Sequence, residues 1–154
     1  EILAFPEDKI GFLLAINTIL IVLFEIPLIR GLEKFKATRI MALGALLFCI
    51  GFGILPIGSG YIFVIITVTI WTFGEILIFP NMAASVSKRA SEENLGKYMG
   101  MYSFAFSLAF AVAPAIGGFI YGNLSPSCLW FGIGLLGLVI GVGFILTGRM
   151  IDGN

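Results

Sequence analysis

The chain of 154 residues is 59% hydrophobic and only 12% charged, with zero net charge and a mean hydropathy of +1.09. A soluble domain carries about 25% charged residues, so this composition indicates a membrane protein. The balanced charge suggests no nucleic-acid partner. Because the sequence contains no histidine, imidazole proton relays and most zinc sites are excluded.

Two features of the ends and the cysteines bear on chain organisation. The first residue is Glu1 and no signal peptide is visible, so we expect that the chain either begins within a longer protein or was trimmed. Cys49 and Cys128 both fall in apolar runs, where we expect small core residues rather than a disulfide or a ligand pair.

Apolar stretches recur along the chain at membrane-spanning length. About 20 apolar residues of helix cross the bilayer core of about 30 Å. Stretches free of Lys and Arg, of which the second is short, lie at residues 10–29, 40–55, 61–79, 98–120 and 128–147. The sequence therefore predicts an all-α, polytopic membrane bundle of five transmembrane helices.

The basic residues fall on one side of these spans. Of the nine Lys and Arg residues, only Lys9 would lie on the other side. The remainder lie in the first connection, in the third connection and beyond the last span: Arg30, Lys34, Lys36, Arg39, Lys88, Arg89, Lys97 and Arg149. By the positive-inside rule, we expect a multi-pass protein of the cell membrane with a cytoplasmic C-terminus.

Small residues indicate where the helices pack. Helices in lipid approach closely through small side chains, and Gly134, Gly137 and Gly141 form such a strip in the last span. In the fourth span, Pro114 precedes Gly117 and Gly118 and removes a helical hydrogen bond. This segment is either a bend that serves packing or a hinge that flexes during transport. Ser103 and Ser107 share a face with Pro114, and that face is expected to look toward protein or water.

Two acids, Glu25 and Glu75, stand inside predicted spans. A carboxylate in the membrane must find a partner or a wet cavity, or take up a proton, because low dielectric disfavours the charged form. Glu75 is either a protonatable site facing a cavity or one half of an ion pair with the first basic loop. For Glu25, an interfacial ion pair is favoured over a protonatable site, and both acids are candidates for proton coupling or gating. Polar stripes accompany both acids and supply cavity candidates: Asn17, Thr18, Trp71 and Thr72.

Four features together resemble the C-terminal half of major facilitator superfamily transporters, from the eighth helix to the twelfth. They are the loop "PLIRGLEKFKATR", the segment "GEILIFP", the segment "ENLGKYMGMYSFAFSLAFAVAPAIGG" and the topology itself. Glu33, Lys34 and Arg39 match the acidic and basic positions of that family's loop between helices eight and nine, whereas Ile29 and Lys36 stand where the family has glycine. The resemblance covers essentially residues 1–154, which would form one incomplete transmembrane bundle.

The resemblance implies a twelve-helix fold with a substrate site between two bundles and alternating access. It also implies a latch in which Glu75 pairs with Lys34, Lys36 or Arg39 of the cytoplasmic loop that also holds Glu33. Expected partners are the lipid bilayer, the missing N-terminal half and a small-molecule substrate. The motifs look most like efflux carriers that exchange a small amphipathic compound for protons, with a proton gradient and no cofactor. The alternatives are a nutrient-uptake carrier of the same superfamily and a non-transporting membrane interaction protein; no enzymatic constellation is present.

Overall fold

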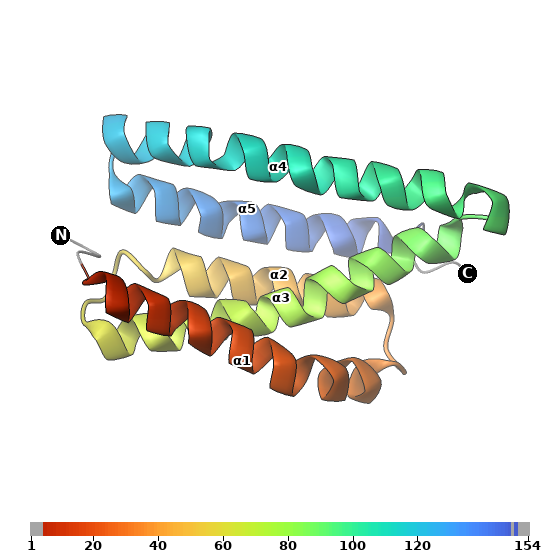
Figure 1. The fold of residues 1–154 in the computed structure, drawn as a ribbon, viewed down its shortest axis with the longest axis horizontal. Coiled ribbons are helices and arrows are strands. Elements are labelled where there is room, and N and C mark those ends of the chain that lie inside the picture. The colour runs from red at the N-terminus through yellow and green to blue at the C-terminus, as the bar shows by residue number, and fades with distance from the viewer. Residues whose placement is uncertain (1–4, 149, 151–154) are drawn as a thin grey trace.

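The computed structural model describes residues 5–148 and residue 150, and within them all regular secondary structure is helical, with no strand. The elements are α1 (Glu7–Leu32), α2 (Ala37–Gly53), α3 (Tyr61–Arg89), a 3-10 turn η1 (Glu92–Asn94), α4 (Leu95–Asn123) and α5 (Pro126–Leu146). The predicted all-α helix bundle is therefore confirmed. The five helices run side by side along the long axis of the molecule (Figure 1).

The helices begin and end close to the predicted spans, with one clear exception. We expected the third span to end at residue 79, before Pro80, but α3 continues through Pro80 to Arg89. Proline removes one backbone donor, and nearby polar side chains can bond to the carbonyls of the same helix. Asn81 Nδ2 donates to the carbonyl of Leu77 at 2.9 Å, and Ser85 Oγ donates to that of Asn81 at 2.7 Å. Consequently Glu75 lies near the middle of α3 rather than close to its end.

The start of α5 follows from its local sequence. Ser125 precedes the helix and its Oγ accepts a hydrogen bond from the backbone N–H of Cys128 at 3.1 Å. Pro126 occupies the first helical position, where the missing N–H has no cost. The same helix start leaves Cys128 exposed, whereas Cys49 is half-buried, and both thiols are free.

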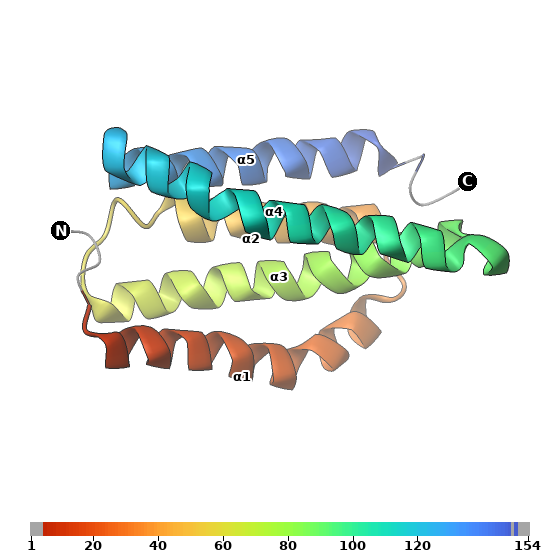
Figure 2. The same ribbon diagram turned by 45° about the horizontal axis from the view of Figure 1, so that its top comes forward.

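The order of packing places α2 at the centre, between α3 and α5. α1 packs on α3 at one edge, and α4 runs along the other edge with few contacts to its neighbours (Figures 1 and 2). Within α4, no described residue is buried, whereas α3 has buried residues from Val64 to Ile78. The bundle is therefore tightly packed around α2 and open around α4.

Glycines allow the close approach of α2 to both neighbours. A Cβ built on Gly44 of α2 would lie 2.9 Å from the carbonyl oxygen of Gly74 in α3. On the opposite face, a Cβ on Gly137 of α5 would lie 2.9 Å from the backbone nitrogen of Cys49. Backbone atoms cannot give way as a flexible side chain can, so no larger residue fits there without moving a helix. The sequence prediction that Gly134, Gly137 and Gly141 lie at a helix contact is confirmed, since all three are buried.

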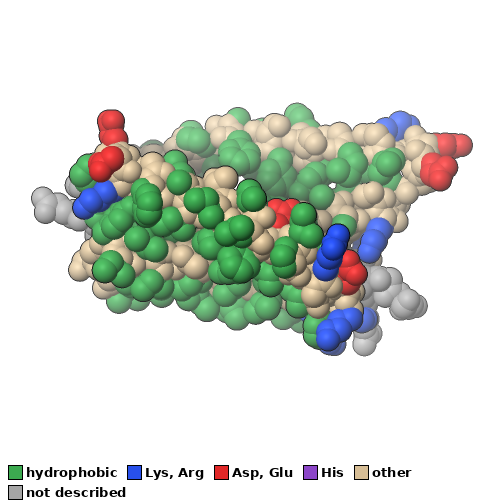
Figure 3. Space-filling view, turned by 60° about the horizontal axis from the view of Figure 1, so that its bottom comes forward, with side chains coloured by type: hydrophobic (Ala, Val, Ile, Leu, Met, Phe, Trp, Pro, Cys, Tyr) green, Lys and Arg blue, Asp and Glu red, His purple; other side chains and the backbone are tan. Residues whose placement is uncertain are grey.

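Most large apolar side chains point outward, which is the pattern of a bundle surrounded by lipid. The visible face is largely hydrophobic, and charged side chains gather mainly toward its two ends (Figure 3). Within the described residues, α1, α3, α4 and α5 are long and apolar enough to cross a membrane, whereas α2 is a shorter apolar helix. One end of the bundle, here called the basic end, carries the residues Arg30, Lys34, Lys36, Arg39, Lys88, Arg89 and Lys97.

Candidate functional site

The site centres on a hydrogen bond between α1 and α3. Asn17 Nδ2 donates to Glu75 Oε2 at 2.7 Å and to Thr72 Oγ1 at 2.9 Å. Thr72 in turn donates to the carbonyl oxygen of Val68 at 2.7 Å. The two amide protons of Asn17 are thus used by two groups that lie three residues apart on one face of α3. This polar trio, Asn17, Thr72 and Glu75, is the principal hydrogen-bonded link between these two helices.

Burial makes the trio energetically significant. Thr72 is completely buried, while Asn17 and Glu75 are half-buried. A carboxylate in apolar surroundings is costly unless a donor faces it, and hydrogen bonds to charged groups contribute about 1.5–3 kcal/mol. Asn17 supplies that donor from a different helix. A change in the charge of Glu75 would therefore alter the attraction between α1 and α3.

A cavity of about 410 Å³ opens beside the trio. Asn17 and Glu75 supply its polar groups, and the remaining walls come from apolar and aromatic residues of α1, α3 and α5 and of the α2 end. Three of these walls form a stack: the Phe52 ring lies 4.3 Å from Trp71 and 6.0 Å from Trp130, centroid to centroid. Such a cavity, apolar with a few polar groups, is typical of small-molecule sites.

One polar atom beside this cavity has no partner. The indole Nε1 of Trp130 is buried, and within the described residues no hydrogen-bond acceptor faces it. Buried indole N–H groups usually find an acceptor. The cavity therefore borders an unused donor on α5 as well as an acceptor, Glu75, on α3.

At the end of the bundle opposite the basic end, aromatic contacts join α1 and α3. Tyr61 donates its hydroxyl to the carbonyl oxygen of Lys9 at 3.1 Å, and the Lys9 ammonium lies 5.2 Å from the centre of the Tyr61 ring. The Phe5 ring packs edge-on against Tyr61. These contacts fix the register of α1 on α3, which keeps Asn17 opposite Glu75.

Other predicted cavity residues lie elsewhere. Ser103 and Ser107 line a separate hollow of about 650 Å³ between α3 and α4, together with the aromatic rings of Phe79, Phe106 and Phe110. Thr18 is exposed and donates to Leu14 of its own helix at 3.1 Å. The structure thus brings Asn17, Trp71, Thr72 and Glu75 together and places Thr18, Ser103 and Ser107 outside that site.

The loop residues predicted to form a latch are all exposed: Glu33, Lys34, Lys36 and Arg39. The Lys34 ammonium lies 5.4 Å from the centre of the Phe35 ring. In the part of the chain that the structure describes, Glu75 makes its contact with Asn17 and none with this loop. Glu25 is half-buried on α1, and no hydrogen bond joins it to the trio. The latch and the role of Glu25 stay predictions.

The proposed hinge lies in the open part of the bundle. Pro114 is exposed within α4, and a Cβ built on Gly117 or Gly118 would meet nothing within 4 Å in the described residues. The helix is continuous through the proline. Its surroundings leave room for bending, and the hinge itself stays a prediction.

Sequence reasoning missed two parts of the site. It placed Asn17 and Glu75 on separate polar stripes without pairing them, because nothing in the sequence sets the register of α1 on α3. It also omitted Phe52 and Trp130, which are distant in sequence and meet only through the α2–α5 contact.

Comparisons with known proteins place this geometry in a family. The model of the Major Facilitator Superfamily matches residues 1–150. The Na⁺, Li⁺, K⁺/H⁺ antiporter of Planococcus maritimus is 26% identical over 142 residues, which are 92% of this chain and 32% of that protein. The chain therefore spans about a third of the length of this curated relative. No solved structure matches the chain. The superfamily resemblance drawn from the motifs is confirmed, the placement in the C-terminal half stays a prediction, and the chain belongs to the Major Facilitator Superfamily.

Proposed function

We propose that this chain is part of a proton-coupled secondary transporter that exports a small amphipathic compound by alternating access, with Glu75 as the residue at which proton and substrate compete. The chain provides a transmembrane bundle that would complete its pathway with the N-terminal half of the same transporter. The observation that supports the proposal is that the trio and the aromatic cavity lie together, near the middle of α3.

The chemistry of the trio suits such an exchange. In the charged form, the Glu75 carboxylate accepts a hydrogen bond from Asn17 Nδ2. After protonation, the carboxyl group carries its own O–H donor and no longer attracts the amide protons as strongly. Asn17 belongs to α1 and Glu75 to α3. Protonation of Glu75 would therefore weaken the contact between these two helices, and loss of the proton would strengthen it. A two-state rearrangement of helices driven by a local charge change is a general route to switching.

The cavity suits an amphipathic guest. The stacked rings of Phe52, Trp71 and Trp130 offer flat apolar walls, and Trp71 lies one helical turn from Glu75. An aromatic or aliphatic body would rest on the rings while a polar group reached the trio. Sugars would need more amides than the described walls provide, since Asn17 is the one amide that lines this cavity.

The test uses the full-length transporter in liposomes with an imposed pH gradient and a fluorescent amphipathic dye. Glu75→Gln keeps the shape of the side chain and a carbonyl oxygen that can accept from Asn17 Nδ2, but it cannot exchange a proton. Gradient-driven dye accumulation should be lost, whereas exchange of dye without a gradient should persist. Glu25→Gln is the matched control because it changes the second acid in the spans and should retain gradient-driven transport. Full pH-driven accumulation in Glu75→Gln would overturn the proposal.

A second candidate is the exchange of a monovalent inorganic cation for protons. The Thr72 hydroxyl oxygen and the Glu75 carboxylate oxygen both lie within 2.9 Å of Asn17 Nδ2 between two helices, and hydroxyl and carboxylate oxygens are ligands for hard cations. The relative from Planococcus maritimus carries a name that describes this type of exchange. Proton movement in the same liposomes on addition of Na⁺, Li⁺ or K⁺, with no organic dye present, would favour this candidate over the first.

A further inference from the structure

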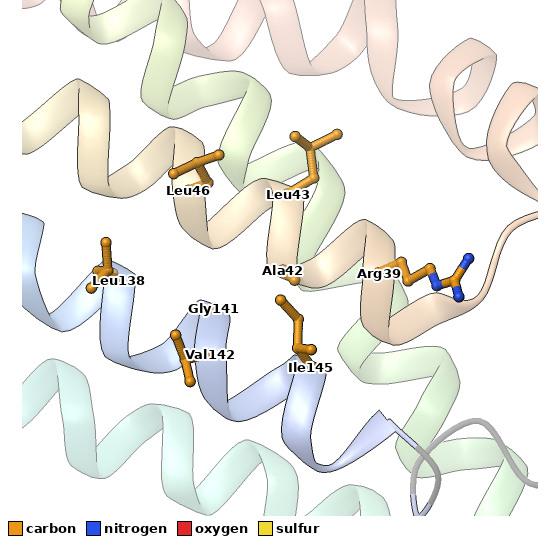
Figure 4. Close-up of a pocket in the computed structure, with 9 residues that line it drawn as sticks. Arg39, Ala42, Leu43, Leu46, Leu138, Gly141, Val142 and Ile145 are labelled. Carbon is orange, nitrogen blue, oxygen red and sulfur yellow. The ribbon is translucent and has the colours of Figure 1, made fainter.

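A groove of about 330 Å³ runs along the α2–α5 contact, away from the polar trio. Its walls are the apolar side chains of Ala42, Leu46, Leu138, Val142 and Ile145, and Arg39 lies at one end. Figure 4 shows these α2 and α5 side chains flanking the seam, with the Arg39 guanidinium directed toward the basic end. Among the residues that line the groove, none is acidic.

The groove is a consequence of the close helix packing. Gly137 and Gly141 allow α5 to approach α2 closely, and the bottom of the groove between the two helices is therefore narrow. Leu46, Leu138 and Val142 rise beside the bottom of the groove and are 45%, 47% and 47% exposed. The groove therefore opens outward from the described helices, and its apolar walls suit a hydrocarbon chain.

The dimensions fit one leaflet of a bilayer. From Arg39 to Leu46 the α2 axis rises about 10 Å, at about 1.5 Å per residue. Half of the hydrocarbon core measures about 15 Å. A groove of this length that starts at the basic end matches most of one acyl chain in the leaflet on that side.

The charge at the mouth fits an anion. Arg39 is exposed, and within the described residues its side chain makes no ion pair. Lys36 precedes α2 as its N-cap, and the first turn of α2 holds no acidic residue. The N-terminus of a helix attracts negative charge, and Arg pairs well with phosphate oxygens. A site suited to an anion thus lies at the Arg39 end of the apolar groove.

We propose that this groove binds an anionic phospholipid, with its phosphate at Arg39 and one acyl chain between α2 and α5. The headgroup lies at the bilayer surface of the basic end, and the acyl chain covers the glycine seam. A basic residue near a membrane surface contributes about 1 kcal/mol toward anionic lipid, which corresponds to about fivefold in affinity. The site is separate from the transport cavity, so the proposal does not depend on the transported substrate.

The experiment measures lipid binding to the full-length transporter by native mass spectrometry, with phosphatidylglycerol and phosphatidylcholine as probes. Arg39→Gln should weaken phosphatidylglycerol binding about fivefold and leave phosphatidylcholine binding unchanged. Arg30→Gln is the matched control, since Arg30 is an exposed Arg of the same basic end on α1. It should change neither. Ala42→Leu, which fills the groove, should weaken the binding of both lipids.

Two results would overturn the proposal. Equal losses in Arg39→Gln and Arg30→Gln would show general attraction by the basic end instead of a site. An effect of Arg39→Gln with none for Ala42→Leu, in a protein that keeps its thermal stability, would show that the phosphate binds without the acyl chain in the groove. Because Arg39 is exposed, its replacement is not expected to prevent folding.

Discussion

The replacement Gly137→Ala tests whether the glycine contact holds α2 and α5 together. The added methyl group would lie 2.9 Å from the backbone nitrogen of Cys49, 3.0 Å from the carbonyl oxygen of Ala45 and 3.2 Å from the Cα of Cys49. Ordinary contacts begin at 3.4 Å, and all three neighbouring atoms belong to the backbone. No rotamer change relieves the overlap, so α5 must move away from α2.

The required shift and its cost follow from these distances. To relieve the largest overlap, α5 must move by about 0.5 Å. A gap of that size removes about a quarter of the attractive energy of each van der Waals contact that it opens. Because Gly134 and Gly141 pack on the same helix, the loss extends along the seam. Overpacking of this kind costs about 1–3 kcal/mol. Alanine also has a higher helix propensity than glycine, by up to about 1 kcal/mol. The control must therefore be another Gly→Ala replacement in the same helix.

Gly132→Ala is that control, because it lies in the same helix and a Cβ there meets nothing within 4 Å in the described residues. The free energy of unfolding of the full-length transporter should be measured in mixed detergent micelles for both variants, with tryptophan fluorescence as the signal. Gly137→Ala should be less stable than Gly132→Ala by about 1–3 kcal/mol. Equal stability of the two proteins would refute the view that backbone contact across the seam carries the α2–α5 packing.

Two further outcomes follow from the site. Thr72→Val removes the buried hydroxyl that accepts a hydrogen bond from Asn17 and should lower the free energy of unfolding by about 0.6 kcal/mol. Thr18→Val is the control, because it changes an exposed hydroxyl and should leave the free energy of unfolding unchanged in the same measurement. Pro114→Ala restores a helical hydrogen bond in the exposed part of α4 and should slow transport in liposomes without lowering thermal stability, if the proline is a hinge; unchanged transport would assign it to packing alone.

The predictions from sequence succeeded where composition and local pattern suffice. Apolar runs of bilayer length predicted the helices, because in lipid a chain must satisfy its backbone hydrogen bonds within each helix. The glycine strip of α5 predicted a close helix contact, because only small residues allow it. The ends were less accurate: proline predicted a stop at residue 79, yet α3 continues through Pro80 to Arg89, since a helix in lipid can tolerate the loss of one backbone donor.

The site was predicted in its residue types but not in its pairing. The sequence showed that Glu75 needs a neutralising partner, and a basic loop residue was one expectation. The structure places Asn17 opposite it, because the contact of Tyr61 with Lys9 and the packing of α1 on α3 set the register, and the pairing with the loop stays a prediction. A hydrogen-bond partner 58 positions away in the chain is decided by helix packing and leaves no local pattern.

The sequence by itself determined that this chain forms membrane helices, that all of its described basic residues except Lys9 lie at one end, and that a costly acid stands within the third span. These properties depend on each segment alone, through its hydropathy, its length and its charges. Only the tertiary structure decided which faces meet: the Asn17–Glu75 pair, the aromatic cavity and the groove ending at Arg39. Their physical origin is the interhelical distance and register, which small residues permit and which side-chain contacts between distant segments then fix.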